Sequence, residues 1–92
     1  MATTVNPFTV RACGEIDLDT GPRLHREVER ALARHREVVL DLSEVTFMDC
    51  AGLNAVIRAR ELAERRGRRL VLRGIGHPVA RLLKLTGASL TP

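Results

Sequence analysis

Aromatic residues and lysine are scarce in this sequence. It contains no tryptophan or tyrosine and only two phenylalanines, Phe8 and Phe47, and Lys84 is its only lysine. Proteins that bind single-stranded nucleic acids stack the bases on aromatic side chains, and this chain lacks a set of rings for such a platform. The formal net charge is +4, but glutamates are interleaved with the arginines. Because a surface that follows a phosphate backbone needs a segregated cationic stripe, the sequence predicts no nucleic-acid partner.

Cysteine is also rare, and long apolar runs are absent. Cys13 and Cys50 are not arranged as C-x-x-C, and none of the three histidines stands at a spacing that would complete a zinc site with them. We therefore expect no metal and no cofactor. The chain has no apolar stretch of about 18 residues and no signal-peptide segment after Met1, so we expect a cytoplasmic protein without membrane contact. In the cytoplasm both thiols are expected to be reduced.

The order of the predicted elements indicates a small α/β fold. The 92 residues, 45% of them hydrophobic, suffice for a single domain, residues 1–92 with a core at about 8–88. Hydrophobic periodicity and turn residues predict strands over 8–13, 37–42 and 68–73, and helices over 22–34, 51–66 and 79–86. Strands that alternate with helices pair in parallel through right-handed crossovers. Little chain remains at either end to cover the sheet edges, which favours a weak homodimer.

The connections carry their own signals. Residues 14–21 are expected to form a loop, and residues 43–49 a bend. Thr20 and Asp49 are predicted N-caps, because short polar side chains accept hydrogen bonds from the first helical turn. Gly67 is predicted to end the second helix in a left-handed conformation.

The stretch from Val38 to Asn54 leads from a buried strand into a helix. Val38–Leu42 is a compact, largely apolar run typical of a strand buried on both faces. Behind Asp49, apolar residues recur at helical spacing: Leu53, Val56, Ile57, Leu62 and Ala63. Ligand sites in α/β proteins commonly lie where a strand ends and a helix begins. This junction is therefore the candidate site.

Three segments of the sequence resemble the STAS domain family. Residues 41–53, DLSEVTFMDCAGL, resemble its pattern D-L-S-x-V-x-F-M-D-S-S-G-L. Residues 14–17, GEID, with Thr20-Gly21-Pro22 and Leu24, resemble G-E-I-D…T-A-P-x-L, and residues 79–87, VARLLKLTG, resemble V-x-R-L-L-x-L-T-G. The resemblance covers about residues 8 to 88. It implies a mixed, mostly parallel sheet with helices packed mainly on one face.

The resemblance is to bacterial anti-sigma factor antagonists, and it implies a regulatory function. Such a protein acts in transcription regulation by partner switching and is not an enzyme; its usual partner is an ATP-binding anti-sigma factor of the serine kinase type. In the family the first serine after the conserved aspartate is phosphorylated. Cys50 stands there and Ala51 replaces the second serine, which implies a non-phosphorylatable variant. The implied partner-binding residues are Asp17, Thr20, Asp49, Cys50, Ala51, Gly52, Leu53, Asn54 and Arg58.

Three alternatives remain open. The chain could be a STAS scaffold or accessory subunit, ligand-binding or transporter-linked, without any function in sigma-factor regulation. It could be an enzyme with Cys50 as nucleophile, although no motif places a histidine beside that residue as a base. Finally, Cys13 and Cys50 could form a redox pair, since the resemblance implies that their strands are neighbours, and oxidation there would reshape the loop.

Overall fold

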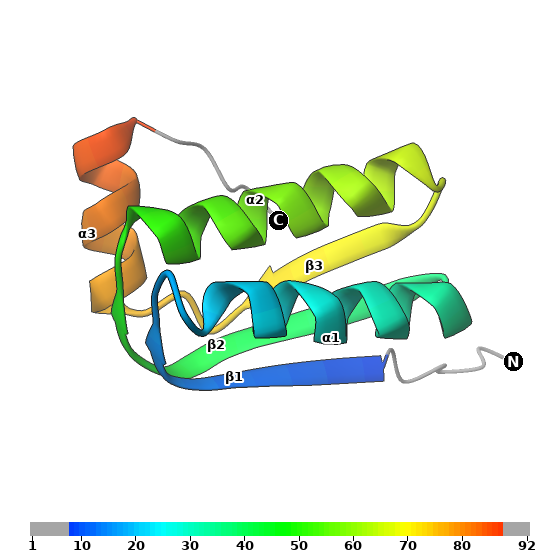
Figure 1. The fold of residues 1–92 in the computed structure, drawn as a ribbon, viewed down its shortest axis with the longest axis horizontal. Coiled ribbons are helices and arrows are strands. Elements are labelled where there is room, and N and C mark those ends of the chain that lie inside the picture. The colour runs from blue at the N-terminus through cyan, green and yellow to red at the C-terminus, as the bar shows by residue number, and fades with distance from the viewer. Residues whose placement is uncertain (1–7, 88–92) are drawn as a thin grey trace, which may run out of the picture.

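The computed structural model describes residues 8–87 as three strands and three helices in strict alternation (Figure 1). The elements are β1 (Phe8–Ile16), α1 (Gly21–Arg34), β2 (Glu37–Met48), α2 (Cys50–Arg65), β3 (Arg69–Arg73) and α3 (His77–Thr86). The predicted α/β order is confirmed, and the helix ends lie within two residues of the predicted ones. Gly67 follows the C-cap residue Arg66 of α2 and has φ +65°, as predicted for a glycine that ends a helix.

The three strands form one sheet in the order β1-β2-β3, and both pairs are parallel. Within residues 8–87 no antiparallel strand joins them, so the described sheet is wholly parallel rather than mixed. α1 and α2 lie side by side over one face, while α3 lies at the end toward which the strands point (Figure 1). The largest fully buried side chains come from these helices and the central strand: Val28, Leu32, Val38, Leu40, Leu42, Val56 and Val79.

Both long strands extend past their predicted ends. Residues 14–16, predicted to be a loop, continue β1, and residues 43–48, predicted to be a bend, continue β2. The pairing shifts register between Arg11 and Cys13 and again between Gly14 and Glu15. At each shift β2 contributes one extra residue, as in a β-bulge, so its buried residues Leu42, Val45 and Met48 stand three apart. This spacing hides the alternation by which a strand is recognised in a sequence.

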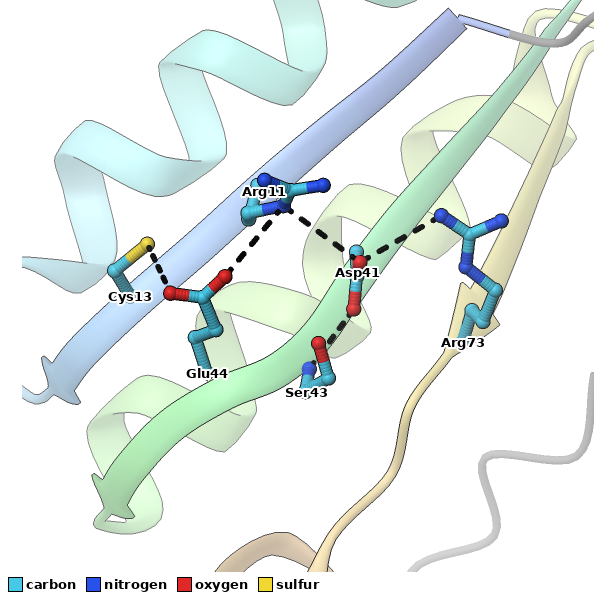
Figure 2. A network of polar contacts seen from close by, with 6 residues as sticks. All are labelled: Arg11, Cys13, Asp41, Ser43, Glu44 and Arg73. Atoms are coloured by element: carbon cyan, nitrogen blue, oxygen red, sulfur yellow. Dashed lines mark hydrogen bonds and ion pairs between the residues drawn. The ribbon is translucent and has the colours of Figure 1, made fainter.

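The face of the sheet opposite the helices carries a row of charged side chains (Figure 2). The register places Arg11 and Arg73 on either side of Asp41, with Nε of Arg11 3.8 Å and a terminal nitrogen of Arg73 3.5 Å from its Oδ2. Oδ1 accepts the backbone N–H of Ser43 at 2.9 Å, and this hydrogen bond, more than the two arginines, lowers the pKa of Asp41. Asp41 is therefore a buried carboxylate whose two oxygens both have polar partners, as the burial of a charged group requires.

Candidate functional site

The site predicted from the sequence lies at the carboxyl end of the sheet. All three strands are parallel, so the segments after β1, β2 and β3 emerge at the same edge (Figure 1). Gly52 decides how closely α2 approaches this edge. A Cβ built on Gly52 would lie 2.1 Å from the carbonyl oxygen of Ile16, which is the last residue of β1. Only glycine allows the first turn of α2 to rest on the end of the neighbouring strand.

Asp49 caps α2, as the sequence predicts. Its backbone is extended, with φ −102° and ψ −176°, and its Oδ1 accepts the N–H of Gly52 at 2.8 Å. Its own N–H donates to the carbonyl of Ile16 at 3.3 Å, which ties the junction to β1. The carboxylate is thus engaged by the helix, and Cys50 follows it as the exposed first residue of α2.

Asp17 and Thr20 bind each other instead of presenting free polar groups. Oδ1 of Asp17 accepts the N–H groups of Asp19 and Thr20, each at 3.0 Å. The hydroxyl of Thr20 accepts the N–H of Asp17 at 2.8 Å and lies 2.8 Å from the carbonyl oxygen of Glu15. The backbone hydrogen bond from Thr20 is the main reason that the pKa of Asp17 is lowered. These side chains hold the loop between β1 and α1 in shape.

Thr20 occupies the predicted N-cap position of α1, but its side chain makes no capping hydrogen bond. Its backbone is helical, with φ −92° and ψ −23°, and the hydroxyl is engaged by the end of β1. The prediction was right about the position and wrong about the contact. The reason is that the tertiary approach of Glu15 and Asp17 offers the hydroxyl partners that the local sequence does not reveal.

The remaining predicted site residues divide by exposure. Cys50, Asn54 and Arg58 are exposed and Ala51 is half-buried, so these four share the surface of the first turns of α2. Gly52 and Leu53 are buried and support this surface from below. A partner that docks at this end of α2 would therefore meet Cys50, Asn54 and Arg58 directly.

The structure does not bring Cys13 and Cys50 together. Cys13 pairs with Glu44 in the register, and its Sγ lies 4.0 Å from the carboxylate of that residue, on the open face of the sheet (Figure 2). β2 ends at Met48, four residues after Glu44, and four residues of strand span about 13 Å. Cys50 lies beyond that end and begins α2, which covers the other face of the sheet. Both thiols are free and exposed. A disulfide would require the two Cα atoms to approach within about 7 Å.

A groove beside Cys50 was missed in the sequence analysis. It has a volume of about 290 Å³ and lies between the starts of α1 and α2. Its lining includes Leu18, Pro22, His25 and Arg26, none of which was predicted as a site residue, together with Arg58. One signal was available, because Leu18 is an apolar residue between two aspartates in a loop, and it is 74% exposed.

Two features that were considered in the sequence, a metal-ligand cluster and a cysteine–histidine pair, were sought among residues 8–87. No cluster of three potential metal ligands occurs within residues 8–87. In the same part of the chain, no hydrogen bond joins Cys50 to a histidine, so a nucleophile–base pair is not formed there. None of the helices in this range has the length and apolar character needed to span a membrane.

The chain matches a family model over residues 1–89, and the description of that model is "Mlab, STAS domain". An anti-sigma-B factor antagonist of Listeria monocytogenes is 35% identical over 77 residues, which are 83% of this chain and 68% of that protein. An anti-sigma factor antagonist from Mycobacterium paratuberculosis has a crystal structure with a TM-score of 0.68 and 31% identity, over 86% of this chain and 68% of that one.

A more distant structure agrees in fold. The unphosphorylated anti-sigma factor antagonist SpoIIAA aligns with a TM-score of 0.70 and 17% identity, over 94% of this chain and 77% of that one. The similarity therefore extends over nearly the whole parallel sheet and its helices. Together with the match of the family model over residues 1–89, these similarities show that the chain belongs to the STAS domain family.

Proposed function

We propose that this protein is a regulator of the anti-sigma factor antagonist type. It binds an ATP-binding anti-sigma factor of the serine kinase type through the exposed start of α2 and the loop that precedes it. Support comes from the sequence similarity to named antagonists and from the geometry of residues 49–58. The single observation that carries the proposal is the capped helix start, where Asp49 binds Gly52 and position 50 faces solvent.

Cys50 makes this a constitutive rather than a switchable binder. SpoIIAA has been solved in a phosphorylated form, but this chain has a thiol at position 50 and a methyl group at position 51. A phosphate at the start of α2 would add negative charge beside Asp49 and would carry a desolvation cost into any interface. Without a hydroxyl, the surface stays in the unmodified state and keeps its affinity. We expect the binding to occur in the cytoplasm, with weak homodimerisation at most.

The test uses the ATP-binding anti-sigma factor encoded by the same bacterium and isothermal titration calorimetry. Cys50→Asp places a carboxylate where the family carries phosphate, and we expect it to raise Kd at least about tenfold, the equivalent of 1.4 kcal/mol. Cys13→Asp adds the same charge at the other exposed cysteine, on the opposite face of the sheet, and should leave Kd unchanged. Cys50→Ser should bind like the original protein and should also take up phosphate from labelled ATP.

A STAS scaffold without a function in sigma-factor regulation is the second candidate. The absence of a hydroxyl at both positions 50 and 51 favours it, because a protein that is not regulated by phosphorylation requires no serine there. Equal affinity of the Cys50→Asp variant and the original protein would show that the start of α2 is not the interface. Absence of any binding by the original protein would favour the scaffold.

A further inference from the structure

The groove between α1 and α2 has an apolar floor. Pro22 from α1 and Ala51 and Ala55 from α2 line it, and Leu18 stands at its rim with 74% of its surface exposed. The two helices approach closely here, because a Cβ on Gly21 would lie only 3.2 Å from Cβ of Ala55. Small residues therefore leave a groove whose lining includes Ala51, the residue after Cys50. An exposed leucine at such a rim is available for contact with another apolar side chain.

The groove has cationic walls. His25 and Arg26 line it from α1, and Arg58 lines it from α2, while none of its lining residues is acidic. Within residues 8–87, neither Arg26 nor Arg58 takes part in an ion pair, and the same holds for Arg30 and Arg65 outside the groove. In the loop before α1, the carboxylate of Asp17 accepts backbone hydrogen bonds of the loop itself, and the exposed Asp19 is not among the residues that line the groove. Two arginines thus line the same groove, and its lining contains no acidic residue to balance their charge.

We propose that this groove receives a protein segment that carries carboxylates on both sides of an apolar side chain. The apolar side chain would contact Leu18 and the alanine floor, and the carboxylates would pair with Arg26 and Arg58. This inference rests on the proposed function, since it specifies the chemistry of the partner that docks beside Cys50. Charge complementarity of this kind sets the choice of partner and the association rate, and arginine is prominent among residues that dominate interface energy.

A protein segment fits the groove better than a small molecule does. The groove has a volume of about 290 Å³, which is at the lower limit of small-molecule sites, since these span about 300–1,000 Å³. The rim residue Leu18 is mostly exposed, so a small ligand would leave it in water. An extended or helical segment would cover the rim and reach both arginines at once.

The first experiment needs no anti-sigma factor. A synthetic peptide of alternating glutamate and leucine residues is titrated into the 15N-labelled protein, and amide shifts are followed by NMR. We expect the shifts to centre on Leu18, Ala51 and Ala55. A peptide with lysine in place of glutamate should produce none of them. Equal shifts with the lysine peptide, shifts centred elsewhere, or displacement of the peptide by inorganic phosphate at low millimolar concentration would overturn the inference.

Charge reversal supplies the matched comparison. Arg26→Glu with Arg58→Glu should raise Kd for the acidic peptide at least about tenfold, because each introduced carboxylate repels the ligand. Arg30→Glu with Arg65→Glu makes the same change in net charge on the same two helices, at exposed residues outside the groove, and should change Kd less than about twofold. Equal increases in Kd for the two double variants would show that only the net charge of the protein matters for peptide binding, and would refute the proposal.

The same variants then separate this inference from the proposed function. If the anti-sigma factor binds the Arg26→Glu, Arg58→Glu protein as tightly as the original, the groove proposal fails while the proposed function stands. If the acidic peptide binds in the groove but the anti-sigma factor does not bind at all, the proposed function fails and the groove has a different acidic partner. Parallel losses for both ligands support both proposals.

Discussion

Replacement of Gly52 by alanine should destabilise the whole domain. The new Cβ would lie 2.1 Å from the carbonyl oxygen and 2.7 Å from the carbonyl carbon of Ile16. Those atoms belong to the backbone of β1, and the same oxygen accepts the N–H of Asp49. A flexible side chain could move aside, but this carbonyl cannot move without loosening the end of the strand. The first turn of α2 must therefore lift away from the sheet.

Two opposing effects set the size of the loss. Alanine is favoured over glycine within a helix by about 1 kcal/mol, whereas overpacking of a well-packed interior costs about 1–3 kcal/mol and occasionally more. Because the contact is with backbone, we take the upper value of about 3 kcal/mol, which leaves a net loss of about 2 kcal/mol. For a domain of this size, that loss lowers Tm by about 8–16 °C.

Urea unfolding followed by far-UV circular dichroism measures this loss directly. Gly76→Ala is the control, because a Cβ there would meet no atom closer than 3.8 Å and the backbone has an ordinary φ of −93°. The control should lose less than about 1 kcal/mol. A Gly52→Ala protein that is as stable as the control would refute the close approach of α2 to β1. It would also remove the basis for placing Cys50 at the edge of the sheet.

Three other predictions concern the same region. Asp49→Ala removes the cap of α2 and should cost about 1 kcal/mol of unfolding free energy in the same urea assay, whereas Asp49→Ser should retain most of it. Asp17 and Asp41 both have a lowered pKa in the folded protein, so the stability they contribute is present above about pH 3.8 and is lost as pH falls through the folded values. Unfolding free energies measured between about pH 6 and pH 2 should therefore fall less steeply in a variant with asparagine at both positions; an unchanged slope would contradict these hydrogen bonds. Cys50→Asp should weaken anti-sigma factor binding at least about tenfold in calorimetry, and unchanged affinity would move the interface elsewhere.

Local chemistry predicted most of the fold. Helical spacing of apolar residues located α1 and α2, and the caps Asp49 and Gly67 appear where short polar side chains and glycine are locally preferred. The second half of β2 was not predictable in this way. There the bulges place buried residues three apart, and pairing with β1 stabilises a strand that the sequence pattern does not show.

The candidate site was predicted in part. The junction at Asp49 and Cys50 could be located because strand, cap and helix follow one another in the sequence. The contribution of α1 and of the loop before it could not be predicted, since Leu18, His25 and Arg26 are distant from Ala51 along the chain and line a groove with it only in the folded molecule. Likewise Asp17 and Thr20 were predicted to face a partner, and their prediction as contacts stays open, but in the fold their side chains bind the loop itself.

The sequence by itself determined the order of elements, the capped start of α2 and the absence of a hydroxyl at positions 50 and 51, because each depends on residues close together in the chain. Only the tertiary structure decided that Cys13 and Cys50 lie apart and that α1 and α2 together line a cationic groove. The physical reason is that register and helix packing arise from contacts between distant segments. The register pairs Cys13 with Glu44 on the open face of the sheet, and the small residues Gly21 and Ala55 let the two helices approach closely.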